Sequence, residues 1–186
     1  MKALYKKNMW FNAAFILVSI IVGYLSNSNA MLADALFCLS LMAISIKPKS
    51  LFIKIYTPIL TAVSVIMCWF TFSSIQTSIL DIGLADAPQL WALPFLAIIF
   101  IAKIFLVFVV TDTEKTEQNK KSLSDISKLY KFSVVITAAV LIGLFASYLT
   151  DFFIEGAVAF AVSFIALVNS GKLMIESLKK NKEKEQ

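Results

Sequence analysis

The sequence of 186 residues contains no histidine and no arginine, and only 16% of it is charged. Without histidine, Ser-His-Asp triads and most zinc chemistry are excluded. Without arginine, no side chain can grip a phosphate with two parallel hydrogen bonds. The two cysteines, Cys38 and Cys68, form no CxxC motif, which argues against a structural zinc site or a disulfide framework. Glycine-rich phosphate loops, HExxH and nucleophile elbows are also missing, so we predict neither an enzyme nor a bound cofactor.

Apolar residues, by contrast, are abundant and lie in long runs. They make up 59% of the chain, and the mean hydropathy is +0.82. A helix needs about 20 residues to cross the hydrocarbon core of a bilayer. The alternating pattern of a membrane β-barrel is not seen, so the sequence predicts an all-α polytopic membrane protein. The six predicted spans are Met9–Leu25, Ser28–Ile46, Leu51–Ile75, Leu90–Val110, Phe132–Leu149 and Phe152–Val168.

The lysines give these spans an orientation. All 17 cationic side chains are lysines, and only Lys103 lies deep inside a predicted span. The other lysines lie in the two tails and at the second and fourth connections, and the first, third and fifth connections have none. The positive-inside rule therefore predicts that both termini are cytoplasmic. Because the lysines form no stripe with interleaved aromatic residues, no nucleic-acid partner is expected.

The chain is predicted to be one membrane domain with a short tail. Residues 1–178 are expected to form a six-helix transmembrane domain, and residues 179–186 a charged cytoplasmic tail. The first apolar stretch has no convincing cleavage site, so we interpret it as a retained span and not as a signal peptide. The lipid bilayer is the expected partner, and the inner (cytoplasmic) membrane of a bacterium is the expected location.

Ionisable residues inside a span are costly and are therefore candidates for function. Asp34 and Cys38 lie four residues apart in the second span, so a carboxylate and a thiol can converge on one ion. Two ligands alone do not make a metal site, and the alternatives are a hydrated Asp34 and a Cys38 that is simply a small buried apolar residue. Lys103 is predicted to snorkel toward the headgroups.

Polar residues elsewhere in the spans have simpler interpretations. Asp151 and Glu155, at the start of the sixth span, could attract a cation, although acids at this position also complement the helix dipole, which is the interpretation we favour. Asn12 in the first span and Ser170 near the end of the sixth are predicted to form hydrogen bonds between helices.

Two stretches carry a family resemblance. Residues 16–40 read ILVSIIVGYLSNSNAMLADALFCLS, preceded by Asn12, and residues 141–178 read LIGLFASYLTDFFIEGAVAFAVSFIALVNSGKLMIESL. An early Asn, a Gly, a Ser-containing turn and a "LADAL" segment, followed by a last hairpin opened by an Asp, resemble the transmembrane domain of cation diffusion facilitators. The resemblance implies six spans with both termini inside, a homodimer, and no counterpart here of the family's cytoplasmic domain.

The resemblance also implies a site. In that family a divalent metal, exchanged for protons, is held between the second and fifth spans by two residues four apart on each. In this sequence the second-span pair falls on Asp34 and Cys38, and the fifth-span pair, counted back from residues 142–144, falls on Ser127 and Lys131. The implied metal ligands are therefore Asp34, Cys38 and Ser127. A lysine ammonium has no lone pair to offer, so we expect an ion pair between Asp34 and Lys131 to replace the metal.

Two hypotheses follow, and a proton or monovalent-ion pathway that uses Asp34 and Lys131 as a relay lies between them. The first is a cation transporter that resembles divalent metal/proton antiporters of the cation diffusion facilitator type and needs Asp34. The second is a non-transporting member of the same fold that serves as a membrane subunit or scaffold for a partner protein. The altered set of ligands favours the second hypothesis, and the retained Asp34 favours the first.

Overall fold

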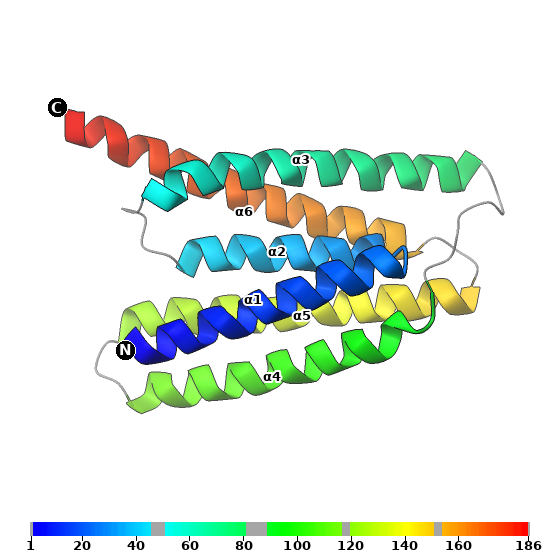
Figure 1. The fold of residues 1–186 in the computed structure, drawn as a ribbon, viewed down its shortest axis with the longest axis horizontal. Helices are drawn as coiled ribbons and strands as arrows, with labels where there is room; N and C mark the ends of the chain where they lie inside the picture. The colour runs from blue at the N-terminus through cyan, green and yellow to red at the C-terminus, as the bar shows by residue number, and fades with distance from the viewer. Residues whose placement is uncertain (1, 46–50, 81–88, 117–119, 151–153, 186) are drawn as a thin grey trace.

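The computed structural model describes residues 2–45, 51–80, 89–116, 120–150 and 154–185. Within these residues the chain forms six α-helices and no strand, which confirms the predicted all-α fold. The helices are α1 (Lys2–Leu25), α2 (Asn29–Ser45), α3 (Leu51–Leu80), α4 (Ala92–Thr116), α5 (Lys120–Thr150) and α6 (Ile154–Glu185). They form an antiparallel bundle in which α1 begins at the same end where α6 ends (Figure 1).

Among the described residues, four helices contain an apolar stretch long enough to cross a bilayer, and α1 and α2 contain shorter ones. All six stretches lie where spans were predicted. The helices extend further at the lysine-rich end of the bundle: α5 begins at Lys120, and α6 continues through the predicted tail as far as Glu185. The long stretches are Ile55–Gln76, Ala92–Thr111, Ser127–Thr150 and Ile154–Leu178, and the shorter ones are Trp10–Leu25 and Asn29–Met42.

Large apolar side chains cover the outside of the bundle. Trp69, Phe105 and Ile142 are 75%, 69% and 67% exposed, whereas Ser64 and Ser163 are fully buried. Small residues at helix contacts let the backbones approach closely, and the large apolar residues outside match the hydrocarbon of a bilayer. This distribution is the one expected of a bundle that is solvated by lipid.

A tight turn joins α1 to α2. Asn27 has a φ of 55°, a left-handed conformation that asparagine adopts more readily than most residues. The amides of Asn27 and Ser28 donate to the carbonyls of Tyr24 and Gly23, which is the Schellman pattern at a helix end. The Ser28 hydroxyl then accepts from the Met31 amide and caps α2. Two consecutive helices are thereby reversed within three residues.

Close contacts also join α5 to α6 and α1 to α5. At Gly143 of α5, an added Cβ would lie 2.8 Å from a methyl group of Val158 in α6, so only glycine fits without a shift. The predicted helix-to-helix hydrogen bond of Asn12 is confirmed, because its amide donates to the Tyr130 hydroxyl of α5 at 2.6 Å. The Ser170 hydroxyl instead donates to a carbonyl of its own helix, that of Leu167.

Helix α2 packs against α1, α3, α5 and α6. As a result, the side chains at the middle of α2 are shielded from the surroundings of the bundle. Met31, Ala33 and Phe37 have no exposed surface at all. A polar residue on this helix must therefore find its partners inside the protein.

Candidate functional site

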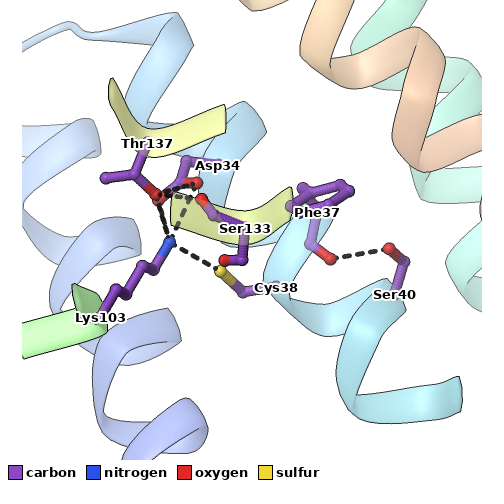
Figure 2. A network of polar contacts seen from close by, with 7 residues as sticks. All are labelled: Asp34, Phe37, Cys38, Ser40, Lys103, Ser133 and Thr137. Carbon is purple, nitrogen blue, oxygen red and sulfur yellow. Dashed lines mark hydrogen bonds and ion pairs between the residues drawn. The ribbon is translucent and has the colours of Figure 1, made fainter. Parts of the chain in front are cut away.

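Three helices bring polar side chains together in the interior of the bundle. Asp34 and Cys38 come from α2, Lys103 from α4, and Thr137 from α5 (Figure 2). Asp34 and Thr137 have no exposed surface, and Cys38 and Lys103 are 2% and 3% exposed. Because Asp34 and Cys38 are one helical turn apart, both point to the same side of α2, as the sequence predicted.

The ammonium of Lys103 lies at the centre of this group. Its Nζ is 2.9 and 3.1 Å from the two carboxylate oxygens of Asp34, 2.6 Å from the Thr137 hydroxyl and 3.2 Å from Cys38 Sγ. An ammonium has three N–H donors, and here three side chains receive them. The Thr137 hydroxyl is also within donating distance of Asp34 Oδ1, at 3.0 Å. The ammonium is therefore fully satisfied without water.

The charges of Asp34 and Lys103 balance one another. Burying either charge alone in a membrane interior would cost several kcal/mol. The ion pair, at 2.9 Å and with both side chains buried, leaves the group neutral. Lys103 therefore does not snorkel, and that prediction is wrong. Asp34, the partner of Lys103, is the only acid predicted deep in a span. The sequence therefore contained a signal for this ion pair, because two opposite charges inside the spans are expected to pair.

The ion pair predicted between Asp34 and Lys131 is also wrong. Lys131 is exposed on α5, and Asp34 is paired with Lys103 instead. Ser127 is buried, but its hydroxyl lies 3.3 Å from that of Thr111 and not in the group around Asp34.

The α5 residues that face Asp34 and Cys38 are Ser133 and Thr137, again four apart. The Ser133 side chain lies beside Cys38, and the Ser133 carbonyl accepts from the Thr137 hydroxyl at 3.0 Å (Figure 2). Ser133 lies six residues beyond the predicted Ser127, about 9 Å along the helix. The predicted pairing of helices was thus right, but the register on α5 was shifted. The sequence did contain a signal for Ser133 and Thr137, because these two hydroxyl residues have the same spacing of four as Asp34 and Cys38.

We call Asp34, Cys38, Lys103, Ser133 and Thr137 the Asp34 cage. The residues that surround the ammonium offer carboxylate, hydroxyl and thiol groups, and such groups also bind metal cations. A divalent ion does not fit beside the ammonium, because Nζ already occupies the centre and would repel it. In the part of the chain that the structure describes, no cluster of three or more Cys, Asp or Glu residues could hold a metal.

A second buried acid lies near the opposite end of the bundle from the chain termini. Glu155, in the first turn of α6, is fully buried, and its Oε1 accepts from the Ala30 amide and the Ser28 hydroxyl, both at 2.7 Å. Glu155 therefore lies in the first turn of α6, as predicted, and also caps the N-terminus of the neighbouring helix α2. Asp151, the other acid predicted here, lies outside the described residues.

Comparison with known proteins supports the family resemblance. The family model described as the cation efflux transmembrane domain matches residues 57–180, which is about two thirds of the chain. The match covers α3 to α6 and includes Lys103, Ser133 and Thr137, whereas the α2 residues Asp34 and Cys38 precede it. No curated protein matches the chain.

Proposed function

Because the chain belongs to the cation efflux family, we propose that it carries a cation across the membrane and that Asp34 is the group that receives the ion. Members of this family are membrane transporters of the cation diffusion facilitator type and not enzymes. The integral membrane character follows from the apolar helices together with the family. What remains to be argued is how this particular site would serve transport.

One observation supports the proposal: the Lys103 ammonium, itself a cation, is enclosed by the groups that would receive the transported ion. It contacts a carboxylate and a thiol from α2 and a hydroxyl from α5 at 2.6 to 3.2 Å. A protein interior that surrounds a positive charge in this way is electrostatically suited to a cation of similar size. For transport, the incoming cation takes the place of the ammonium, and Asp34 remains the negative partner.

The family resemblance extends the proposal to exchange of a divalent metal for protons, with Asp34 and Cys38 as ligands. The contacts in the cage make Thr137 and Ser133 better supported ligands than Ser127, whose hydroxyl is paired with that of Thr111. A divalent ion can enter only after Lys103 has left the cage, because the two positive charges would otherwise lie within a few ångströms of each other.

A second candidate function is that of a non-transporting membrane subunit or scaffold for a partner protein. The observation that favours it is the same ion pair: Asp34 and Lys103 satisfy each other inside a group that is closed to water. In this case the lysine replaces the metal permanently and holds α2, α4 and α5 together. The partner is then another membrane protein or a second copy of this chain.

The proposal includes an orientation and an assembly. The lysines at the ends of α5 and α6 support cytoplasmic termini, and the family supports a homodimer. The proposed location is the inner membrane of a bacterium. Thiol labelling of cysteines placed at either end of the chain, in intact and in inverted membrane vesicles, tests the orientation, and crosslinking in membranes tests the dimer.

Flux measurements discriminate between the two candidate functions. The purified full chain is reconstituted in proteoliposomes, and uptake of Na⁺, K⁺, Mn²⁺ and Zn²⁺ is measured with and without a pH gradient. Transport of any of these ions that is lost in Asp34→Asn and kept in Lys131→Met supports the transporter, because Lys131 is an exposed lysine outside the cage. Absence of flux for every ion, together with a stoichiometric partner on purification, supports the subunit.

A further inference from the structure

Buried polar side chains follow one face of α5 from the Asp34 cage toward the end of the bundle where α1 begins and α6 ends (Figure 1). They are Thr137 and Ser133 of the cage, then Tyr130 and Ser127, and each is at most 8% exposed. Ser127 and Thr137 are about 15 Å apart along the helix, and the four positions fall within about a third of its circumference. Polar residues that face the interior of a membrane bundle often mark the path of an ion.

In the opposite direction from the cage, the neighbouring side chains on α2, α4 and α5 are apolar. They belong to the main apolar core, and each is at most 3% exposed: Ala30, Met31, Leu96, Ile99, Val140 and Leu144. A cation that leaves water needs oxygen groups in place of its hydration shell, and hydroxyls supply them whereas an apolar core does not. The described side chains therefore favour access to the cage from the end where α1 begins.

A hydrogen bond between helices lies on this side of the cage. The Asn12 side-chain amide of α1 donates to the Tyr130 hydroxyl of α5 at 2.6 Å, and both residues are 8% exposed. Tyr130 also packs with Leu106 and Val110 of α4 in a small apolar cluster. Tyr130 therefore contacts both α1 and α4 at the position on α5 between Ser127 and the cage.

From these contacts we infer that the Asp34 cage opens toward the end of the bundle that holds the chain termini, along this face of α5, and that the bond between Asn12 and Tyr130 closes the route. The inference rests on the proposed transport function and adds the side from which the cation reaches the cage. A single neutral hydrogen bond is weak enough to break and re-form in the folded protein, unlike the buried ion pair of the cage. Asn12 and Tyr130 are positioning residues, because neither is part of the cage.

The native Cys38 thiol can report access to the cage. In a Cys68→Ser background it is the only cysteine of the chain. The full chain is treated with a membrane-impermeant methanethiosulfonate reagent in intact and in inverted membrane vesicles, and mass spectrometry gives the rate of modification from each side. Tyr130→Phe removes the hydroxyl and keeps the ring. Ser147→Ala is the matched control, because it removes a buried α5 hydroxyl that accepts a hydrogen bond, also at 2.6 Å, on the other side of the cage.

Tyr130→Phe should speed the modification of Cys38 about threefold to tenfold from the side on which the chain termini lie, because one hydrogen bond no longer opposes opening. Asn12→Ala should give the same increase and the double variant no more, since both changes break one bond. Ser147→Ala should leave both rates as they are in the background. The inference is overturned by an equal increase in Ser147→Ala, by an increase from the opposite side only, or by no modification from either side in any variant.

Uptake of cations is measured separately and decides the proposed function. Modification of Cys38 with the expected sidedness in a chain that transports no cation supports the route and removes the transport. Uptake that is present while Cys38 is modified only from the opposite side overturns the route and leaves the proposed transport function standing.

Discussion

The two buried acids of this bundle are stabilised in different ways. Asp34, in the middle of α2, is paired with the Lys103 ammonium and the Thr137 hydroxyl. Glu155, at the start of α6, instead accepts from the Ala30 amide and the Ser28 hydroxyl at the N-terminus of α2. One acid is neutralised by the charge of a side chain, and the other is held by backbone and hydroxyl donors.

This difference indicates a functional role for Asp34 and a structural role for Glu155. A lysine ammonium on a flexible stem can be exchanged for another cation, whereas a backbone amide at a helix end cannot leave. The Asp34 cage is therefore the proposed binding site, and Glu155 is a helix cap that joins α6 to α2. Five predictions test this separation by changing the acids and their partners, singly or as a pair.

Lys103→Met should have the largest effect on stability. It strands the Asp34 carboxylate, which has no exposed surface, and leaving one member of a buried ion pair unpaired costs about 3 to 5 kcal/mol. The measurement is reversible unfolding or thermal denaturation of the full chain in detergent. Lys131→Met is the control and should change stability by less than about 0.5 kcal/mol, as for other exposed sites.

The double variant Asp34→Leu with Lys103→Met sharpens this result. It replaces both charges by apolar groups, and a buried pair replaced in this way is often neutral or stabilising. We therefore expect the double variant to recover most of the stability that Lys103→Met loses, but not to bind a cation. If the double variant is as unstable as the single one, packing and not the stranded charge explains the loss.

Glu155→Ala should destabilise the protein by about 2 kcal/mol, because the Ala30 amide and the Ser28 hydroxyl lose their acceptor in a buried position. Uptake of cations by the folded fraction should remain, since this acid lies outside the cage. Glu155→Gln keeps an oxygen acceptor and should retain more stability than Glu155→Ala. Loss of transport in Glu155→Gln at full stability would show that the two acids are not separate in function.

The sequence was sufficient to predict the helices, but not to predict the rotation of each helix about its axis or the depth at which its residues meet those of its neighbours. The apolar runs predicted the all-α fold and the positions of its six helices, because length and hydropathy decide whether a segment spans a bilayer. The face shared by Asp34 and Cys38 also followed from their spacing of four residues. Such local regularities do not depend on how the helices pack.

The partners of Asp34 depended on packing. A helix that is apolar on all sides has no amphipathic pattern from which its rotation can be inferred. The predicted register on α5, counted along the chain from residues 142–144, placed Ser127 and Lys131 where the structure places Ser133 and Thr137. Lys103 was predicted to reach the headgroups on the basis of its depth alone. The packing of α4 against α5 and α1 brings it to Asp34.

Ser28→Ala should cost about 1 kcal/mol, because the hydroxyl both donates to Glu155 and accepts from the Met31 amide at the start of α2. Both contacts lie at the cap of the helix and not in the cage. Thermal denaturation should therefore shift downward, and cation uptake per folded molecule should stay unchanged. A changed ion preference in this variant would mean that the cap and the cage are coupled through α2.

Thr137→Val should have the smallest effect on stability and yet a clear effect on transport. It removes one of the three acceptors of the Lys103 ammonium and one hydroxyl near Asp34, whereas the ion pair itself remains. Hydrogen bonds between membrane helices contribute about 0.6 kcal/mol on average, so the expected loss of stability is of that order. The incoming cation, however, loses an oxygen ligand that a methyl group cannot replace. Uptake of the transported cation should therefore require a higher concentration in Thr137→Val than in Ser28→Ala, although Ser28→Ala is the less stable of the two. Equal uptake in both variants would show that Thr137 is not part of the cation site.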